Sequence, residues 1–395
     1  MSLVYVTSRF PFGPGEAFLA PEISAHVAAG CELRIFPMLP KGGLVHRDAA
    51  AFVGRTDGVD GRRAAVAGMK NLVTRPGRLT RAAVRAGRSR SRAARMRNYA
   101  VLLRVGALIE ALERARATHV HAHWGGASST LAMAAAEAVG IPWSMTLHRW
   151  DIAANNLLDE KIESACFTRV ISRAAVADVR AVVPEADPVV IHMGVAVDAK
   201  AQELATGRHA GCRLLNVASF VEVKNHRDLV EAFGHLRDLP DVTLDLVGAG
   251  PLVPEIRDLV ASLGLGEKVK LLGPLDHDEL LRRLASREWD GVVLTSAATP
   301  DAHEGIPVSL MEAMAAGIPV LATDSGGTRE LIGEDAGALV PSGDRGALIS
   351  ALAHFVSDPI FRARIAANGH RRVAQEFNAE VVSSELRRLI ATCSA

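Results

Sequence analysis

Short apolar segments alternate with longer amphipathic segments along nearly the whole chain, and this alternation limits the possible folds more than any other feature. Segments of strand length predict β-strands at residues 3–6, 32–36, 118–122, 142–147, 168–171, 189–192, 213–217, 242–247, 269–272, 291–295 and 318–322. Segments with helical spacing of apolar residues lie between or after them, for example at 16–29, 99–117, 128–139, 225–236 and 379–391. Strands that alternate with helices favour parallel sheets covered by helices, so the predicted fold class is α/β.

The chain is long enough for two domains, and the strand–helix series has one interruption. At 395 residues it exceeds the usual size of a single domain. Residues 193–211 lack a clear apolar period and are the expected linker. We predict two Rossmann-like, doubly wound domains at 1–195 and 196–375, and a C-terminal helix within 376–395 that is a candidate for crossing back to the first domain. Two such sheets would face a central cleft, which is the expected ligand site.

Composition argues against several classes of protein. Aromatic residues make up 4% of the chain, so nucleic-acid binding by base stacking is not expected. No apolar run is long enough to span a bilayer, and the first residues lack the pattern of a signal peptide, which predicts a cytoplasmic location. The four cysteines lie far apart without metal-ligand spacing, which predicts reduced thiols and no metal site. They are Cys31, Cys166, Cys212 and Cys393.

Positive charge is concentrated in one segment, although the whole chain has a net charge of only +1. Residues 62–97 contain eleven arginines, one lysine and no acidic residue, so this segment carries +12 and the rest of the chain carries −11. A solvated helix face explains such a run. Equally, the segment is a candidate surface for anionic lipid headgroups or for a diphosphate-bearing acceptor, which would make the protein peripheral on the inner face of a membrane.

Two glutamates eight residues apart give the most specific sign of a ligand site. Glu304 precedes a predicted helix at 308–316, and Glu312 lies just over two turns inside that helix. Pro307 favours a helix start because its φ is fixed and it has no amide proton to leave unpaired. Free amides at such a start attract phosphate, whereas carboxylates beside a phosphate are suited to hydroxyls. The pattern therefore predicts a phosphorylated sugar as the ligand.

Lys224 follows the first strand of the second series, at the point where the strand gives way to a helix. From there its amine can reach a phosphate across the strand ends, and Asn225 is expected to cap the helix. In isolation, a surface lysine beside an ordinary cap explains this segment equally well. The combination with Glu304 and Glu312 favours a phosphate-binding role.

Two further segments are similar to known motifs but are better explained in other ways. Residues 248–250, Gly-Ala-Gly, follow a strand, yet Val253 occupies the position of the third glycine of a dinucleotide fingerprint. A tight turn that lines the cleft is the better interpretation. Residues 276–278, Asp-His-Asp, are similar to a metal-binding DxD motif, but they precede a helix, where capping is the expected role. Without a metal, Lys224 and helix-terminal amides would have to stabilise a departing diphosphate.

The first half of the chain offers a histidine at the end of a strand. His148 is well placed there to contact a sugar hydroxyl, and Asp151 is positioned to orient it. The alternative is a histidine that is merely hydrogen-bonded at a strand end. His121 and His123, on the preceding strand, are expected to be structural or to line the cleft.

A loop rich in glycine and proline follows the first strand. Gly13 and Gly15 permit close approach of the backbone to a ligand, and the helix that begins near Glu16 would direct its N-terminus at the cleft. A plain turn explains the glycines but not their position.

Together these segments resemble the retaining glycosyltransferases of family 4, which have the GT-B fold. The strongest element is the E-x7-E motif, from Glu304 to Glu312, within EGIPVSLMEAMAAGIPVLAT. VEVKNH, VGAGPL, LLGPL, TLHRWDI and IHMGV support it, so the resemblance covers most of the chain. HAHWG, TLHRWDI and EGIPVSLMEAMA look most similar to the bacterial exopolysaccharide branch, of the colanic-acid biosynthesis type.

The resemblance implies a role for each candidate residue. Lys224 would bind the donor diphosphate, Glu312 the nucleotide ribose and Glu304 the donor sugar, while His148 would lie beside the transferring carbon. The implied catalytic residues are therefore His148 and Glu304. The implied donor-binding residues are Ser219, Lys224, Gly250, Gly273, Leu275, Gly305, Ile306, Pro307, Val308 and Glu312. The implied donor or acceptor loop contains Gly13, Gly15, Glu16 and Asp151.

One position departs from the family pattern. The family usually has an arginine five residues before the lysine, and Ser219 stands at that position here. One cation that would bind the diphosphate is therefore missing. Arg149 and Arg9 are candidates to replace it.

The resulting prediction is a metal-independent, retaining glycosyltransferase that needs no cofactor. Its expected partners are a nucleotide sugar and an acceptor hydroxyl on a glycan, a lipid-linked glycan or a small natural product. Another GT-B nucleotide-sugar enzyme, such as an epimerase or an inverting transferase, is the main alternative. The other two are a metal-dependent transferase that uses Asp276 and Asp278, and a non-enzymatic protein that binds anionic lipid or nucleic acid through residues 62–97.

Overall fold

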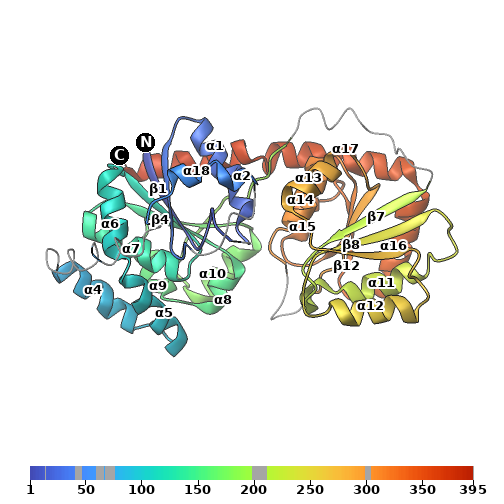
Figure 1. Ribbon diagram of the computed structural model, residues 1–395, viewed down its shortest axis with the longest axis horizontal. Helices are drawn as coiled ribbons and strands as arrows, with labels where there is room; N and C mark the ends of the chain where they lie inside the picture. The colour runs from blue at the N-terminus through green and yellow to red at the C-terminus, as the bar shows by residue number, and fades with distance from the viewer. Residues whose placement is uncertain are drawn as a thin grey trace. The chain divides into compact units, whose positions relative to one another are not determined.

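The computed structural model describes residues 1–13, 15–40, 47–58, 66, 76–197, 211–298 and 304–394. They form two compact units: unit 1 comprises Met1–Gly194 with Glu380–Ala395, and unit 2 comprises Val195–Ala379 (Figure 1). Most of the expected linker, much of the arginine-rich segment and His303 lie outside the described residues.

Unit 1 is built on a six-stranded parallel sheet with the strand order β2-β1-β3-β4-β5-β6. Its strands are β1 (Ser2–Thr7), β2 (Glu32–Pro37), β3 (His119–His123), β4 (Trp143–Leu147), β5 (Phe167–Val170) and β6 (Val189–Val190). The helices are α1 (Ala20–Ala28), α2 (Arg47–Ala50), α4 (Pro76–Gly87), α5 (Arg92–Leu102), α6 (Val105–Arg114), α7 (Ala127–Val139), α8 (Arg149–Ala154), α9 (Leu158–Ser164) and α10 (Ala174–Val182). Every residue of β1, β3 and β4 is buried, as expected for central parallel strands with helices on both faces.

Unit 2 repeats this architecture with the strand order β12-β11-β10-β7-β8-β9, again all parallel. Its strands are β7 (Cys212–Val217), β8 (Val242–Val247), β9 (Val269–Gly273), β10 (Gly291–Leu294), β11 (Val320–Asp324) and β12 (Ala338–Pro341). Its helices are α11 (His226–Gly234), α12 (Val253–Ser262), α13 (His277–Ala285), α14 (Val308–Ala315), α15 (Thr328–Ile332), α16 (Arg345–Ser357) and α17 (Pro359–Glu376). Two Rossmann-like sheets are therefore present, and the predicted α/β fold class is confirmed.

Local signals in the sequence explain several element boundaries. Helix α7 ends at Gly140, which adopts the left-handed conformation, and α14 ends just before Gly317, whose φ is +67°. Asp344 and Asp358 cap α16 and α17 by accepting hydrogen bonds from amides in the first turn of each helix. The expected helix at 308–316 is confirmed to within one residue.

Some expected elements differ from the structure. The single helix expected at 99–117 is two helices, α5 and α6, which separate at Leu103 and Arg104, and both contact α7. The strand β12 was not expected from the sequence. The expected helix at 16–29 begins with a 3-10 turn at Ala17–Leu19 before α1.

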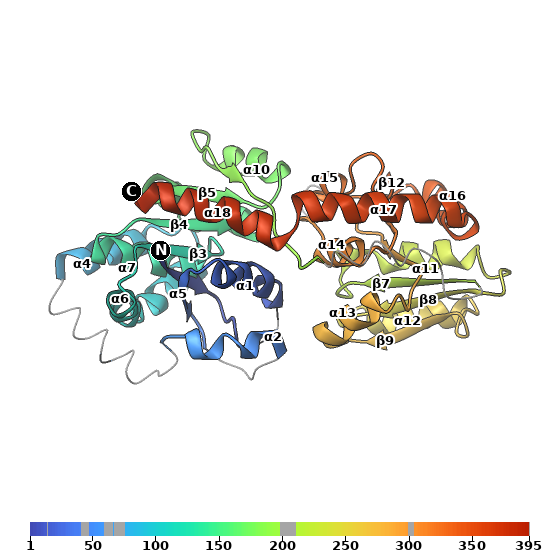
Figure 2. The same ribbon diagram turned by 90° about the horizontal axis from the view of Figure 1, so that it is seen from above.

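The last helix, α18 (Ala379–Ser394), packs against unit 1 (Figure 2). Ser383 donates to the carbonyl of Glu22, and Arg387 donates to that of Ala25, at 3.2 and 3.1 Å. Cys393 near its end forms a disulfide with Cys166, which directly precedes β5. The expectation of four reduced thiols is therefore wrong for this pair, because cysteines 227 residues apart meet in the folded unit. Within the described part of the chain, no helix is long and apolar enough to cross a bilayer.

Candidate functional site

In each unit the candidate residues gather where the strand order of the sheet reverses. In unit 1 the chain passes from β1 outward to β2 and then returns to β3 on the other side of β1. In unit 2, β7 leads outward to β8 and β9 before β10 pairs with its opposite edge. At such a point the connections that leave neighbouring strand ends diverge, which opens a place for a ligand.

Lys224 and Glu304 form an ion pair at the reversal point of unit 2. Lys224 ends a 3-10 turn (Glu222–Lys224) after β7, and its Nζ contacts Glu304 Oε1. Ser296, which follows β10, donates its hydroxyl to the same oxygen. The hydroxyl of Ser325, after β11, accepts from the Glu304 amide at 3.2 Å. Three neighbouring strand ends thus fix a carboxylate whose side chain is only 10% exposed.

Helix α14 begins directly after this carboxylate. Pro307 is its N-cap residue with an extended backbone (ψ 113°), so the proline precedes the first turn instead of lying in it. No described side chain caps this helix start. Ile306 and Pro307 are buried, and Gly305 and Val308 are partly exposed. The first-turn amides of an eight-residue helix therefore lie next to the Lys224–Glu304 pair, in the arrangement that attracts a phosphate.

Glu312 lies in the second turn of α14 and has a histidine partner. Its Oε1 is 2.6 Å from His277 Nε2, and its side chain is 9% exposed. His277 is the first residue of α13, which Asp276 caps by accepting from the amide of Asp278 at 3.0 Å. The expected capping role of this acidic segment is confirmed. The role of His277 as the partner of Glu312 was missed, because 35 residues separate them.

The turn after β8 packs closely against the turn after β7. The backbone of Gly248 and Gly250 has φ values of +149° and +158°. A side chain at either position would collide with the backbone of Ala218 or Phe220. These glycines therefore permit two loops to touch. The remaining donor-site candidates in this region are Ser219, which is exposed, and Gly273 and Leu275, which are half-buried.

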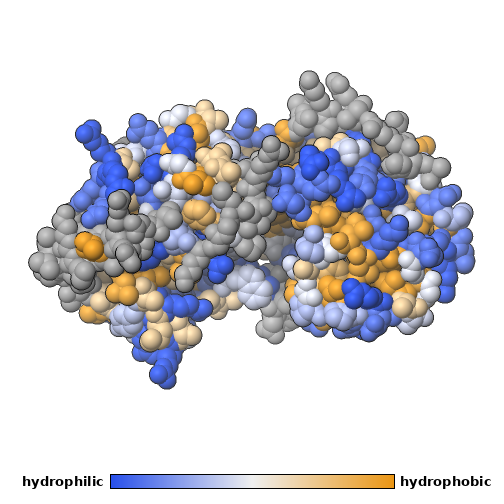
Figure 3. Space-filling model, viewed as in Figure 1, coloured by the Kyte–Doolittle hydropathy of each residue, from blue (hydrophilic) through white to orange (hydrophobic). Residues whose placement is uncertain are grey.

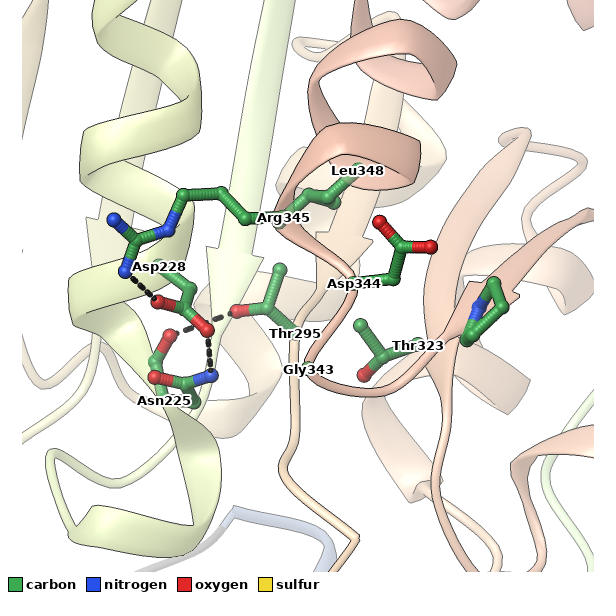
Figure 4. Close-up of a pocket in the computed structure, with 9 residues that line it drawn as sticks. Asn225, Asp228, Thr295, Thr323, Gly343, Asp344, Arg345 and Leu348 are labelled. Atoms are coloured by element: carbon green, nitrogen blue, oxygen red, sulfur yellow. Dashed lines mark hydrogen bonds and ion pairs between the residues drawn. The ribbon is translucent and has the colours of Figure 1, made fainter.

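A shallow depression that is lined by Asn225, Asp228, Thr295 and Arg345, among others, lies at the starts of α11 and α16 (Figure 4). Asp228 accepts from Asn225 Nδ2 at 2.6 Å and from Arg345 at 2.7 Å, and Thr295 donates to the Asn225 carbonyl at 3.1 Å. Asn225 has a left-handed backbone (φ 48°) and occupies the expected N-cap position, but its side chain donates to Asp228 instead of capping an amide. These contacts hold Asn225, the residue that follows Lys224, in place.

Glu16 organises the loop after β1 in unit 1. Its carboxylate accepts from the amides of Ser8, Arg9 and Phe10 at 3.1, 2.6 and 2.8 Å, and from Trp124 Nε1 at 2.5 Å. Because four donors occupy this buried carboxylate, Glu16 holds the loop against the turn after β3 and does not present a free charge. The same loop contains the positive-φ residues Gly13 and Gly15.

His148 lies at the end of β4 within a group of rings. Its Nε2 is 2.7 Å from His123 Nε2, and the centroids of Trp124 and Phe18 are 4.2 and 5.9 Å away. Burial, reinforced by the positive charge of Arg169, lowers the pKa of His148 to about 3. Burial also places the pKa of His123 well below its usual value. Both rings are therefore neutral at pH 7, so His148 can exchange hydrogen bonds with a hydroxyl but carries no charge.

Asp151 positions His148 through the backbone. Its carboxylate accepts from the His148 amide at 2.9 Å as part of the cap of α8, and not from the ring as expected. Burial raises the pKa of Asp151 to about 6 and lowers that of Lys161 to about 7. Lys161 Nζ donates to the carbonyls of Gly125 and Gly126, both at 2.8 Å. A buried carboxyl and a buried amine thus brace the turn after β3.

The arginines proposed to replace the missing cation have other surroundings. Arg9 is exposed, and the guanidinium of Arg149 lies 5.0 Å from the ring centroid of Trp150. His121 hydrogen-bonds to Ser144 and Thr146 within the sheet, as expected for a structural histidine.

Comparison with known sequences identifies the domain in unit 2. Residues 211–372 match the family model of glycosyl transferases group 1. Amylovoran biosynthesis glycosyltransferase AmsK of Erwinia amylovora is 30% identical over 204 residues, which cover 51% of this chain and 50% of AmsK. The putative colanic acid biosynthesis glycosyltransferase WcaL of Escherichia coli is 33% identical over 181 residues, 45% of this chain and 44% of WcaL. The chain thus spans about half the length of the curated relatives it matches, and the resemblance stated from the motifs is confirmed.

Solved structures extend the likeness to both units. Anabaena HepE in complex with UDP has a TM-score of 0.70 and 17% identity, and the match covers 99% of this chain and 100% of HepE. Sucrose-phosphate synthase from Thermosynechococcus elongatus has a TM-score of 0.69 and 20% identity, with 99% of each chain covered. At such identities the likeness shows the fold, so the predicted GT-B fold is confirmed.

Proposed function

We propose that this protein is a retaining, metal-independent glycosyltransferase that moves a sugar from a nucleotide-sugar donor to an acceptor hydroxyl. The observation that carries the proposal is the meeting of Lys224, Glu304 and the open start of α14 at the reversal point of a glycosyl transferases group 1 domain. A cation beside uncapped helix amides suits a diphosphate, and nearby carboxylates suit sugar hydroxyls.

Each group of unit 2 has a part in donor binding. Lys224 and the first amides of α14 bind the diphosphate, Glu304 binds the donor sugar, and Glu312 binds the ribose. In the structure Lys224 is paired with Glu304. The incoming phosphate therefore competes with Glu304 for the amine, and the carboxylate is then available to sugar hydroxyls.

The reaction breaks the bond between the anomeric carbon and the phosphate oxygen. The acceptor oxygen forms its new bond to that carbon on the same face, and its proton passes to the departing phosphate oxygen. When its bond to the anomeric carbon breaks, the departing phosphate oxygen carries an additional negative charge until it takes up the proton. Each preorganised donor that faces this oxygen supplies about 3–4 kcal/mol of transition-state stabilisation.

Unit 1 supplies the acceptor side in this proposal. His148 is neutral and rigidly held, so it serves as a hydrogen-bond partner for a sugar hydroxyl near the reacting carbon. The relatives named above act in amylovoran and, putatively, in colanic acid biosynthesis. By analogy, we propose a glycan or lipid-linked glycan as the acceptor of this chain.

A ligand panel followed by product analysis tests the proposal. Thermal shift with UDP, GDP, dTDP and their sugars should show stabilisation by one nucleotide class, and NMR of the product should show the anomeric configuration of the donor. Full activity in EDTA is expected. An inverted product would support an inverting transferase, an epimerised free donor would support an epimerase, and loss of activity in EDTA would contradict the metal-independent mechanism.

We also propose that α4 and α5 dock unit 1 on an anionic lipid surface. Met96 and Tyr99 of α5 and Leu103, which directly follows the helix, are exposed at helical spacing, and Arg92 and Arg95 lie close to them along the chain. Figure 3 shows hydrophilic and apolar side chains together on the part of unit 1 where Figure 1 places α5. An apolar stripe with flanking arginines suits shallow insertion among anionic headgroups.

Not every arginine of the basic segment belongs to this surface. Arg85 pairs with Glu137 and Glu160, and Arg88 pairs with Glu160, so these two hold α4 within the unit. The five exposed arginines without such a described pairing are Arg81, Arg90, Arg92, Arg95 and Arg97. At about 1 kcal/mol for each basic residue near an anionic surface, five of them suffice for salt-sensitive binding.

Sedimentation with vesicles tests the docking surface. The full chain should bind vesicles of phosphatidylcholine with phosphatidylglycerol at 50 mM salt, and should be released at 500 mM salt. Arg92→Glu combined with Arg95→Glu should weaken binding, whereas Arg282→Glu on unit 2 should not. Equal binding to pure phosphatidylcholine, or no effect of the double substitution, would contradict the proposal.

A further inference from the structure

The carboxylate of Glu312 lies among buried apolar residues. It projects from α14, whose neighbouring residues Leu310, Met311, Ala313 and Met314 are all buried. A carboxylate that is largely removed from water needs hydrogen-bond donors to offset its burial and to fix its orientation. The described donor is His277, whose Nε2 lies 2.6 Å from Oε1.

His277 is itself held in place by the start of α13. The Asp276 cap fixes the first turn of this helix, and Leu280 and Leu284 anchor its buried side. The imidazole therefore reaches Glu312 from a rigid backbone, and it is 23% exposed, so one side of the pair faces solvent. This geometry leaves Oε2 of Glu312 as the oxygen that can meet a ligand.

We propose that His277 is a positioning residue for ribose recognition. It donates from Nε2 to Oε1 of Glu312, which fixes the orientation of the carboxylate and directs Oε2 to the ribose hydroxyls of the donor nucleotide. This inference rests on the proposed function, in which Glu312 binds the ribose. It adds that the protein selects a ribonucleotide donor over its 2′-deoxy counterpart through the His277–Glu312 pair.

Nucleotide binding by variants of the full chain tests this inference. The probes are UDP, GDP and ADP, and the 2′-deoxy forms of each, measured by titration calorimetry. His277→Ala should lower the affinity for the ribonucleotide by roughly tenfold but should change the affinity for the 2′-deoxy form much less. His277→Gln, which can place an amide donor near the former Nε2, should restore most of the loss. His235→Ala, at an exposed histidine of the same unit, should have no effect.

A structural role alone gives a different result. If His277 only stabilised α13, His277→Ala would lower the melting temperature and weaken both nucleotide forms equally, and this outcome would overturn the inference. His277→Ala added to Glu312→Ala should cause no further loss of ribonucleotide affinity. A folded wild-type protein that bound neither the six nucleotides nor dTDP would overturn the proposed function and, with it, the role of His277. Binding of dTDP alone would overturn the ribose selection and leave the proposed function intact. Wild-type binding with an unchanged ribose preference in His277→Ala would overturn the role of His277 alone.

Discussion

The strand order reverses in the same way in the two units, but the candidate groups at the two reversal points differ in charge. Those in unit 2 are charged side chains, and those in unit 1 are neutral histidines. In unit 2 the candidate groups are a half-buried lysine and two largely buried carboxylates, each with a described ion-pair or hydrogen-bond partner. In unit 1 the corresponding place contains neutral histidines beside a buried network of hydroxyls and rings. The difference suits two tasks. Binding a charged diphosphate requires ions that can exchange partners, whereas orienting a neutral hydroxyl requires a rigid, uncharged hydrogen-bonding group.

Low pH should have the largest effect on the difference between the units, because protonation of the buried histidines destabilises unit 1. Burial lowers the pKa of His26 and His119 to about 4 and that of His148 to about 3, and places those of His121 and His123 well below 6.5. The unfolded chain takes up these protons below about pH 6.5, and the folded unit does not. Stability is therefore lost as pH falls below about 6.5, by about 3 kcal/mol for each of His26 and His119 once the pH reaches about 4.

Other groups modify this loss only in part. The pKa of Asp151 is raised to about 6, so its protonation favours the folded state as pH falls from 6 towards 4, but it is one group against five. In unit 2, burial lowers the pKa of His226 in the same way, to about 4. Hydrogen exchange, measured peptide by peptide, should show unit 1 opening between pH 6 and 4.5 while unit 2 stays protected. His119→Gln should make the pH dependence shallower, and equal acid resistance of the two units would contradict the prediction.

Removing the lysine of unit 2 should give the next largest effect. Lys224→Ala removes the cation that we propose to bind the diphosphate and deletes the lysine partner of the Glu304 carboxylate. We expect the affinity for the nucleoside diphosphate to fall about 100-fold, which corresponds to about 2.7 kcal/mol. Titration calorimetry measures the affinity, and circular dichroism checks that the fold is intact.

Lys270→Ala is the matched control, because Lys270 is exposed on β9 of the same unit. Its nucleotide affinity should equal that of the wild-type protein. An unchanged affinity in Lys224→Ala would show that the amine does not bind the diphosphate.

Much of the fold follows from the sequence because parallel strands, buried on both faces, read as short apolar runs. The exceptions have physical causes. β12 has only four residues, ends at a proline and is half-exposed, so its pattern is weak. Helical periodicity continues from α5 into α6, and the break at Leu103 and Arg104 becomes visible only when both helices are packed on α7. The Cys166–Cys393 disulfide depends on how α18 packs against unit 1.

The candidate site, like the fold, could be predicted from the sequence only in part. Lys224, Glu304 and Glu312 could be found from the sequence because each lies in a local pattern at a strand end or a helix start. Their partners could not, since Ser325 and His277 reach them across the sheet. The contact of Trp124 with Glu16 joins residues 108 apart and depends on β1 and β3 being neighbours. A sequence gives spacing along the chain, and the strand order decides which ends meet.

Reduction of the disulfide should destabilise unit 1 but not unit 2, and this is a smaller effect than those above. The Cys166–Cys393 bond closes unit 1 around its C-terminal helix, whereas Cys212 of unit 2 is a free, buried thiol. Cys393→Ser should lower the free energy of unfolding of unit 1 by about 2–4 kcal/mol, mainly because the unfolded chain gains freedom, and should leave unit 2 unchanged. Urea unfolding measures the change. Reductant should reproduce it in the wild-type protein and have no effect on Cys393→Ser.

The smallest expected effect concerns the acidic residues near the site of unit 2, and it decides whether they are structural or catalytic. Asp276 caps α13 with its side chain, whereas Asp278 contributes a backbone amide to the same cap. Asp276→Ala should therefore cost about 1 kcal/mol of stability in unit 2, and Asp278→Ala should cost less. If both carboxylates only serve the helix start, transfer activity in EDTA should persist in both variants. A metal-dependent transferase would instead lose activity in both, and EDTA would abolish the activity of the wild-type protein. A loss of stability alone would thus indicate a helix-capping role, and a loss of activity in both variants would indicate a metal-binding role.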